Sequence, residues 1–494
     1  MILFWPVVIP FFTAVLCLLA WKSTEMQKGI SLAGALALFG SALMIFAEVA
    51  TNGPFAAQAG SWPAPFGITM VADMLSAIMM LLVGFVAVCV VMFSFSDISN
   101  EEIHFGHHTL THALFAGISG AFLTGDIFNM YVWFEVMLIA SFGLLVVGGG
   151  REQFDGAVKY VGLNLIATVA FIAGVGLLYG ATGALNMADL HAKLAGRSSE
   201  AAILASAAFL LFAFGSKAAL FPVFFWLPAS YHTPSFSTSA LFSALLTKVG
   251  VYALIRVFTL VYDIDGTLMQ PILIWGAVLT MLFGALGSLS QNSVRRVLGY
   301  SIITSIGFMI LGLGLGTPLA ITAGAFYLFQ DVLVKANLFL MAGATARLTG
   351  SELFARSGGM WRAHPALSLL FLIPALSLAG VPPFSGFWGK FLLVTAALEV
   401  NGYFLTFAIL ATGFLTLFAM GRVWAAVYWT PHPSGPRAIT GSLGPSTLVP
   451  ILALTIMIVA IGIDANTYVE LATTVGAQIT DPTGYITAVL GGAE

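Results

Sequence analysis

The stretch GSKAALFPVFFWLP, residues 215–228, places Lys217 five residues before Pro222 in an otherwise apolar run. Within a helix, a proline removes one backbone donor and leaves the carbonyl four residues earlier, here that of Ala218, without its usual partner. In lipid, such a break persists only where protein or water satisfies the freed groups. The stretch therefore predicts a broken helix whose lysine and open backbone face the protein interior.

A second stretch has the same arrangement. In LAGVPPFSGFWGKFLL, residues 378–393, Pro383 leaves the carbonyl of Ala379 free and Lys390 follows two turns later. Broken helices at matching positions are typical of transporters that are built from inverted repeats. The two stretches together therefore predict a repeated, transporter-like membrane fold.

The composition of the whole chain places both stretches in a membrane. Of the 494 residues, 59% are hydrophobic and only 8% are charged, and the mean hydropathy is +1.00. A soluble domain carries about a quarter charged residues, so this composition excludes a soluble globular protein. The net charge of -3 argues against nucleic acid as a partner.

Segments long enough to cross a bilayer, about 20 apolar residues each, follow one another with little sequence between them. We expect an all-α integral membrane protein with about 14 transmembrane helices, in which residues 1–494 form a single membrane domain. The predicted spans are residues 2–21, 30–50, 68–94, 108–124, 127–149, 156–180, 202–227, 236–262, 269–290, 296–315, 318–345, 366–398, 402–429 and 446–471.

The two broken helices are the seventh and the twelfth of these spans, five apart. This spacing predicts an inverted repeat of two five-helix units. The first unit comprises helices 4–8, residues 108–262, and the second comprises helices 9–13, residues 269–429.

The basic residues between the spans predict how the chain is oriented. With both termini outside the cell membrane, eleven basic residues lie on the cytoplasmic side and three lie outside. Positively charged loops stay preferentially in the cytoplasm, so we expect this orientation. The cytoplasmic set is Lys22, Lys28, Arg151, Lys159, Arg295, Arg296, Arg347, Arg356, Arg362, Arg422 and Arg437, and the outer set is Lys193, Arg197 and Arg256.

Several ionisable side chains lie inside the predicted spans. A charge at the bilayer centre costs about 2.5–3.5 kcal/mol even on the most lenient scale, so these groups face the bundle interior, water or one another. Fixed ion pairs that hold the bundle together are one interpretation, and Asp331 with Lys335, four residues apart, could pair locally. The other four have no opposite charge nearby on their own spans, which favours a charged pathway: Glu135, Lys217, Lys248 and Lys390.

We interpret these groups as a proton relay. A glutamate–lysine pair whose separation changes can switch the lysine between holding and releasing a proton. The membrane potential supplies about 2.3 kcal/mol per charge per 100 mV, which is enough to drive such a switch. The predicted order is Lys217 under the control of Glu135, then Lys248, the eleventh span with Asp331 and Lys335, and finally Lys390.

Other chemistry has weaker support in the sequence. His232, which follows the broken seventh helix, is a candidate for feeding protons to Lys248. The histidines of IHFGHHTLTH, residues 103–112, lack metal-ligand companions and are interpreted as interfacial. Asp73 and Asp126 lie near span ends, where carboxylates reach water. No pattern indicates haem, iron–sulfur, flavin or nicotinamide chemistry, so we expect no metal, no cofactor and no enzymatic reaction on this chain.

Four segments resemble the proton-translocating antiporter-like subunits of respiratory complex I, membrane-bound hydrogenases and Mrp cation/proton antiporters. The family's seventh-to-eighth-helix signature is similar to WLPASYHTPSFSTSALFSALLTKVGVYALIR, residues 226–256. Further segments match in the same order: QNSVRRVLGYSIITSIGFMILGLG, VLVKANLFLMAG and LAGVPPFSGFWGKF. The resemblance, from about residue 68 to 430, implies fourteen helices with the same inverted repeat and broken helices.

The resemblance also implies roles for single residues. The family's fifth-helix glutamate falls on Glu135, and its lysines of the seventh and eighth helices fall on Lys217 and Lys248. Its terminal charged residue in the twelfth helix falls on Lys390. Many members have a histidine in the eleventh helix, where this chain instead has Gln330, Asp331 and Lys335.

Within the family, FNMYVWFEVMLIASFGLLVVGG and GALNMADL most resemble the D subunits of Mrp-type Na+/H+ antiporters. This implies a proton-translocating subunit that works only with other membrane subunits and exchanges protons, driven by the proton-motive force, for a cation such as Na+. A proton-pumping subunit of a redox enzyme, with quinone or NADH chemistry on other chains, is the alternative. The many buried lysines count against a self-sufficient carrier of organic solutes.

Overall fold

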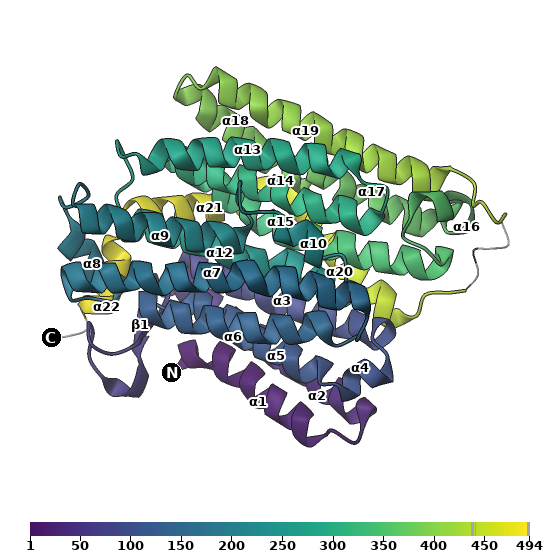
Figure 1. Cartoon of the computed structure of the whole chain (residues 1–494), viewed down its shortest axis with the longest axis horizontal. Coiled ribbons are helices and arrows are strands. Elements are labelled where there is room, and N and C mark those ends of the chain that lie inside the picture. The colour runs from purple at the N-terminus through teal and green to yellow at the C-terminus, as the bar shows by residue number, and fades with distance from the viewer. Residues whose placement is uncertain (436–438, 440, 492–494) are drawn as a thin grey trace.

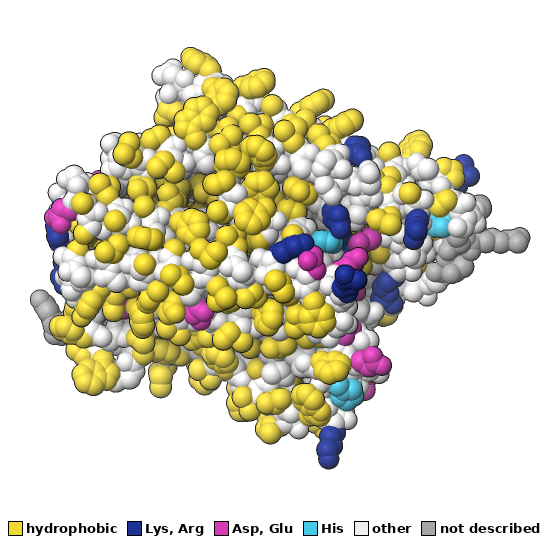
Figure 2. Space-filling model, in the orientation of Figure 1, with side chains coloured by type: hydrophobic (Ala, Val, Ile, Leu, Met, Phe, Trp, Pro, Cys, Tyr) yellow, Lys and Arg dark blue, Asp and Glu magenta, His cyan; other side chains and the backbone are white. Residues whose placement is uncertain are grey.

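The computed structural model of the protein describes residues 1–435, 439 and 441–491. Arg437, one of the basic residues predicted on the cytoplasmic side, lies outside the described residues. The helices lie side by side along the long axis of the molecule and form an elongated bundle (Figure 1). Hydrophobic side chains cover much of its visible face, while many charged side chains gather towards the right-hand end (Figure 2). Such apolar flanks are expected of helices that face lipid.

The first part of the chain is helical apart from one hairpin. α3 begins at Met74, six residues later than predicted, because the Asp73 side chain caps it by accepting a hydrogen bond from the Ser76 N–H at 3.0 Å. The helices are α1 (Trp5–Leu19), α2 (Thr24–Asn52), α3 (Met74–Asp97), α4 (Asn100–His104), α5 (His107–Leu123), α6 (Ile127–Val146) and α7 (Arg151–Thr182).

A short β-hairpin between α2 and α3 departs from the all-α prediction. β1 (Phe55–Gln58) pairs antiparallel with β2 (Thr69–Ala72), and Phe55 lies opposite Ala72. The hairpin lies in the connection between two spans, where backbone groups need not be satisfied within a single helix as they must be in lipid. Residues 69–72, which were predicted to lie at the start of the span 68–94, therefore form a strand instead.

The first broken helix lies where the proline predicted it. α9 (Ala201–Ala218) ends at Ala219, whose φ of +62° leaves the helical path. The chain becomes helical again in α10 (Trp226–Ser230). α8 (Met187–Leu194) precedes this pair, and α11 (Phe236–Leu241), a π-helical turn (Phe242–Leu246) and α12 (Thr247–Leu260) follow as one continuous span.

The second broken helix is also observed. α17 (Pro365–Ala379) ends at Gly380, which has a φ of +86°, and α18 (Ser385–Glu399) begins after the two prolines. The other helices of this part are α13 (Met269–Ser290), α14 (Val294–Leu315), α15 (Pro318–Thr349), α16 (Met360–Ala363), α19 (Tyr403–Val423), which continues into a π-helical turn (Trp424–Trp429), α20 (Pro445–Ile463), α21 (Ala465–Thr480) and α22 (Thr483–Leu490).

Side chains satisfy the backbone groups that the breaks expose. At the first break, the Trp226 indole donates to the Ser216 carbonyl at 2.9 Å, and the Phe221 N–H donates to the Thr280 hydroxyl at 2.8 Å. At the second break, the Lys390 ammonium donates to the Leu378 and Ala379 carbonyls at 2.9 and 2.8 Å. The carbonyl of Ala379 that the sequence predicted to be free is therefore held by the lysine of its own broken helix.

Within the described residues, twelve helices are long and apolar enough to cross a membrane on their own. The two remaining predicted spans coincide with shorter helices, namely α5 with 17 residues and the broken pair α17 and α18 with 15 residues each. The membrane-spanning helical fold is therefore confirmed. The count of fourteen spans and the inverted repeat stay predictions.

Three segments form the interior of the bundle. Most of the residues of Phe236–Leu260, α14 and α15 are buried, whereas α1, α2, α7 and α19 each expose a large part of their surface. A span that is buried on all sides faces protein rather than lipid. The interior segments carry Lys248, Asp331 and Lys335, so the fold encloses the charges that the sequence predicted to face inwards.

We expect the close packing of α12 on the first break to be sensitive to one methyl group. A Cβ added at Gly250 would lie 2.5 Å from the Ala218 nitrogen and 2.9 Å from the Lys217 carbonyl carbon. Gly250→Ala must therefore push α12 away from α9, at a cost of about 1–3 kcal/mol. A lower melting temperature of the purified complex in detergent would register this cost.

Gly299→Ala in α14 is the matched control, because a Cβ there meets nothing within 4 Å. That variant should be neutral or more stable by up to about 1 kcal/mol, since alanine favours a helix over glycine. Equal melting temperatures for the two variants would contradict the packing described here.

Candidate functional site

The centre of the site is an ion pair between two interior helices. Lys248 Nζ of α12 lies 2.8 Å from Asp331 Oδ2 of α15, and both side chains have 0% exposure. The same ammonium donates to the carbonyl of Ser243 at 2.6 Å, in the π-helical turn just before α12. π-helical turns occur frequently at functional sites. The sequence predicted that the partner of Lys248 comes from another helix, and the structure supplies Asp331.

The sequence allowed a local ion pair between Asp331 and Lys335, but the closer partner of Asp331 is Lys248. Lys335 Nζ lies 4.0 Å from Asp331 Oδ1, at the limit of an ion pair, and donates instead to Ser301 Oγ of α14 at 2.7 Å. The four-residue spacing places both groups on one face of α15, but Lys248 approaches that face more closely. Two ammonium groups therefore share one buried carboxylate.

This cluster is short of negative charge. Lys248 and Lys335 carry one positive charge more than Asp331 can balance when both are protonated. An uncompensated buried charge is costly, and a titratable group relieves the cost by giving up its proton. The arrangement can therefore hold one proton that is easily released, which is the chemistry that a relay needs.

Lys390 lies at the second helix break. Besides its two carbonyl partners, its ammonium lies 4.8 Å from the centre of the Phe308 ring of α14. Gly380 and Gly413 approach the lysine so closely that a Cβ would lie 2.7 Å from Cδ and 3.7 Å from Nζ, respectively. The site is thus built from carbonyl oxygens, an aromatic face and glycine backbone, and it offers Lys390 no carboxylate within contact among the described residues.

Glu135 and Lys217 do not form a direct ion pair in the part of the chain that the structure describes. Glu135 of α6 is partly buried and accepts a hydrogen bond from Thr168 of α7 at 2.6 Å. Lys217, at the end of α9, lies with its ammonium 5.7 Å from the centre of the Phe134 ring. Phe134 directly precedes Glu135 in α6. The end of α9 that carries Lys217 therefore lies near the part of α6 that carries Glu135, although the two charged groups do not touch.

A small cavity lies beside Lys217. Its volume is about 10 Å³, close to the minimum that one water molecule occupies. The buried Asn164 side-chain oxygen on its wall has no hydrogen-bond partner among the described residues. Leu246 of the π-helical turn and Val249 of α12, on either side of Lys248 in the sequence, form part of the same wall. The cavity therefore brings Lys217 close to the segment that carries Lys248.

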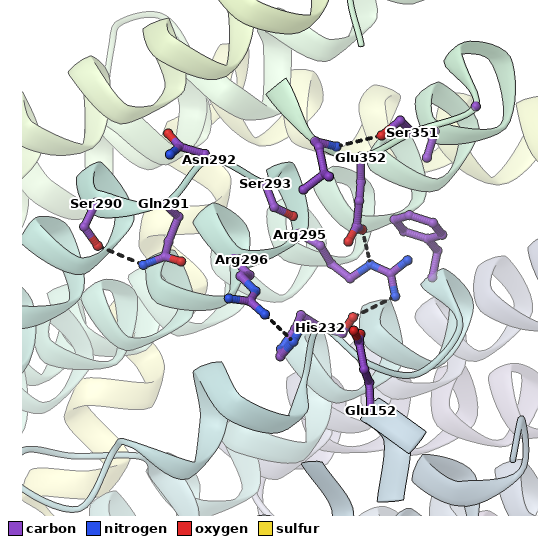
Figure 3. A pocket seen from close by; sticks show the side chains of 14 residues that line it. Glu152, His232, Ser290, Gln291, Asn292, Ser293, Arg295, Arg296, Ser351 and Glu352 are labelled. Carbon is purple, nitrogen blue, oxygen red and sulfur yellow. Dashed lines mark hydrogen bonds and ion pairs between the residues drawn. The ribbon is translucent and has the colours of Figure 1, made fainter. Parts of the chain in front are cut away.

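His232 lies in a polar pocket of about 720 Å³ near the ends of α7, α13, α14 and α15 (Figure 3). Its Nδ1 lies 2.9 Å from the Pro228 carbonyl, and Arg296 donates to its Nε2 at 3.2 Å. Burial, followed by the charge of Arg296, lowers the pKa of His232 below its usual value of 6.5. The imidazole is therefore neutral at pH 7, with Nδ1 donating and Nε2 accepting.

An ion pair holds the wall of this pocket. Arg295 Nε lies 2.7 Å from Glu352 Oε2, and the Arg295 guanidinium also donates to the carbonyls of His232 and Pro234. Figure 3 shows how these side chains line the pocket together with Glu152, Ser290, Gln291 and Asn292. The ring atoms of His232 bond to Pro228 and Arg296, so the structure does not bring His232 into contact with Lys248.

The predictions from the weaker signals hold only in part. His104 is exposed, but His107, His108 and His112 are 0–3% exposed, because α5 packs with this end against α2 and α3. His112 Nε2 bonds to Ser31 of α2 at 2.9 Å. Asp73 and Asp126 do not reach water, since they are 2% and 8% exposed and cap α3 and α6.

The sequence interpretation also missed two partners. Arg256, counted among the outer loop residues, is 5% exposed and pairs with Asp73. The Asp-x-x-Ser pattern at residues 73–76 is a helix-cap signal that could have placed Asp73 correctly. Ser301, the partner of Lys335, carries no such signal. Within the part of the chain that the structure describes, no group of His, Cys, Asp and Glu could hold a metal ion.

The fold and the site together define a class of protein. A bundle of membrane-spanning helices with broken segments encloses a series of buried lysines near the carboxylate of Asp331, which is the construction of an ion-translocating membrane protein. The chain belongs to the family described as "NADH:quinone oxidoreductase/Mrp antiporter, TM", whose family model it matches over residues 124–416.

Two curated relatives, both D subunits of Na+/H+ antiporters, are similar over nearly their whole length. The chain is 40% identical over 485 residues to the relative from Alkalihalophilus pseudofirmus, with 98% of each chain covered. It is 37% identical over 492 residues to the relative from Bacillus subtilis, again with 98% of each chain covered. The resemblance that the sequence motifs indicated is therefore confirmed.

Two solved structures share the fold. A chain of the Mrp complex from Dietzia sp. DQ12-45-1b superposes with a TM-score of 0.91 at 30% identity, and 99% of each chain is covered. A chain of the membrane-bound sulfane sulfur reductase, an archaeal respiratory membrane complex, superposes with a TM-score of 0.90 at 29% identity over 99% of each chain. The same fold is therefore found in an antiporter complex and in a redox complex.

We expect Asp331→Asn to disrupt the centre of the site. The variant leaves the buried Lys248 ammonium without its carboxylate, and breaking a buried pair in this way costs about 3–5 kcal/mol. Proton transport should be lost, and the melting temperature of the purified complex should fall.

Glu352→Gln is the control of matched chemistry, because it removes the carboxylate of a partly exposed pair, with 13% and 30% of the two side chains accessible. Its cost should stay near 0–1 kcal/mol. If both variants lost proton transport and melting temperature to the same extent, the buried pair of Asp331 would matter no more than the exposed pair of Glu352.

Proposed function

We propose that this chain is the proton-translocating subunit of a multi-subunit Na+/H+ antiporter and that its buried lysines carry the protons. The observation that carries the proposal is the cluster in which Lys248 and Lys335 share the single carboxylate of Asp331 with all three side chains fully buried. Lysines favour proton transfer over sodium binding, because a cation site requires oxygen ligands. The relatives that are named as Na+/H+ antiporter subunits support the antiporter context.

The relay starts on the side of the first break. A proton taken up by Lys217, under the influence of Glu135, crosses the small cavity to Lys248 and enters the shared cluster with Asp331 and Lys335. The incoming charge raises the excess positive charge of the cluster, so a proton leaves towards Lys390 at the second break.

His232 has a role at the entrance rather than at the centre of this relay. It lies on the wall of the polar pocket in Figure 3, where protons from the cytoplasm reach the protein, and is neutral and thus able to accept one. Because His232 does not contact Lys248, water molecules or hydroxyl groups must carry a proton from one to the other.

The orientation follows from the basic residues. The starts of α2, α7 and α14 meet at the right-hand end in Figure 1, and Lys22, Lys28, Arg151, Arg295 and Arg296 lie beside these starts in the sequence. Lys193 lies in α8, and Arg197 follows three residues after α8 ends, at the opposite end of the molecule. The right-hand end therefore faces the cytoplasm, with both termini on the outer side of the cell membrane.

The partners of this subunit are other membrane subunits of the same antiporter. The similar chain of the Mrp complex supports such an assembly. The exchange activity then belongs to the assembled complex and is absent when this chain is expressed alone.

A second function has support from a specific observation. The similar chain in the sulfane sulfur reductase belongs to a respiratory complex, so this chain could pump protons in such a setting while redox chemistry takes place on partner chains. Neighbouring genes for subunits with cysteine clusters would favour this alternative, and their absence together with sodium-dependent exchange would favour the antiporter.

We expect Glu135→Ala and Lys217→Ala each to reduce Na+/H+ exchange below about a tenth of wild type, a loss of more than about 1.4 kcal/mol of barrier stabilisation. Everted membrane vesicles that contain the complete complex provide the measurement, and immunodetection of all subunits checks assembly. Lys390→Ala should give the same loss, because it removes the end of the relay.

Lys159→Ala is the control, since Lys159 is exposed and pairs only with Asp155 among the described residues. It should leave exchange unchanged. Normal exchange in the Lys217 variant would reject the relay, whereas proton transport without any sodium dependence would favour the redox alternative.

A further inference from the structure

A second buried ion pair lies on the same helix as Lys248, nearer the outer end. Arg256 Nη1 lies 2.6 Å from Asp73 Oδ2, and Arg256 Nη2 donates to Asp73 Oδ1 at 2.7 Å, so the guanidinium and the carboxylate meet through two bonds. The side chains are 6% and 2% exposed. The Ser76 hydroxyl and N–H also donate to Asp73 Oδ1, which completes the surroundings of the carboxylate.

Two aromatic rings enclose the guanidinium. Its central carbon lies 5.4 Å from the centre of the Tyr252 ring and 5.0 Å from that of Tyr485 in α22. Tyr252 and Tyr485 are themselves buried. The guanidinium therefore lies between rings from two helices, α12 and α22.

The spacing along α12 places this pair in line with the relay. Lys248, Tyr252 and Arg256 follow one another at intervals of four residues and so lie on one face of the helix. The eight residues between Lys248 and Arg256 correspond to about 12 Å along the helix axis. Tyr252 therefore lies between Lys248 and the Arg256–Asp73 pair on the face of α12 that leads towards the outer side.

On the side of Lys248, the hydrogen bonds of Arg256 end at a backbone carbonyl. Arg256 Nη2 donates to the Tyr252 hydroxyl at 3.2 Å, and this hydroxyl donates in turn to the Phe122 carbonyl at the end of α5 at 2.7 Å. A guanidinium has only donors and keeps its proton in a protein. A backbone carbonyl cannot pass a proton on. The chain of bonds from Arg256 to Phe122 therefore cannot conduct.

We propose that the Arg256–Asp73 pair is a proton barrier, which prevents protons on Lys248 from escaping directly to the outer side through α12. Protons that reach Lys248 then have to move laterally to Lys335 and Lys390, so that transport stays coupled to the rest of the complex. Arg256 is a positioning residue in this account, because it acts by closing a route and carries no proton itself. The inference rests on the proposed function, since a barrier has a purpose only where protons arrive.

Arg256→Lys tests the barrier, because a lysine fits the same space and keeps the pair with Asp73 but can release its proton. Passive proton flux is measured in liposomes that contain the complete purified complex, without sodium, after a potassium diffusion potential is imposed. We expect flux at least about tenfold above wild type, which corresponds to about 1.4 kcal/mol taken from the barrier. Adding Lys248→Gln to this variant should return the flux to the wild-type level, because it removes the source of the protons.

The double variant Asp73→Asn with Arg256→Gln distinguishes a barrier from a merely structural pair. It replaces two charges by two amides that titrate no proton, so its passive flux should stay at the wild-type level. A structural role predicts the reverse order, since lysine preserves the ion pair and the two amides abolish it. Wild-type flux in Arg256→Lys, or a larger leak in the amide variant, would overturn the proposal.

The exchange assay and the passive-flux assay together separate this inference from the proposed function. If Lys217→Ala leaves exchange intact, the relay fails whatever the leak of the Arg256 variants. If exchange depends on Lys217 and Lys248 but Arg256→Lys does not leak, the relay stands and only the barrier is rejected.

Discussion

The buried contact between Lys248 and Asp331 is the interaction on which the rest of the site depends. It joins α12 to α15 in the middle of the bundle, where neither side chain meets solvent. Charges without partners cannot be placed there, so the surrounding helices have to be packed closely enough to exclude lipid and to supply hydrogen bonds. Because Lys335 approaches the same carboxylate, the pair is also unbalanced, and this imbalance makes a proton available for transfer.

The broken helices, on both sides of the central pair, also place polar groups in the interior. Each break exposes backbone groups that need a partner in a dry interior, and each has a lysine beside it. At the second break Lys390 binds the exposed carbonyls directly. At the first break Trp226 and Thr280 satisfy the backbone, which leaves the Lys217 ammonium facing a ring and a small cavity. The two lysines therefore have different surroundings although their sequences look alike.

Sequence reasoning reached the membrane-spanning fold, both breaks and the buried charges of the predicted relay, because proline, apolar length and the cost of a charge in lipid act locally. It could not choose between partners from different helices, so the pairing of Asp331 with Lys248 and the contact of Lys335 with Ser301 needed the structure. The same limit explains Arg256, which looks like a loop residue until Asp73, 183 residues earlier, is brought beside it. It also explains the histidines of α5, whose burial comes from packing against α2 and α3.

The most direct test of this account is Na+/H+ exchange by the complete complex carrying Lys248→Arg. Arginine keeps the positive charge and can still pair with Asp331, but it does not release its proton. If Lys248 carries protons, the variant assembles with all its subunits and exchange is lost. If Lys248 only holds α12 against α15, the variant exchanges sodium for protons at close to the wild-type rate, and that result would contradict the relay.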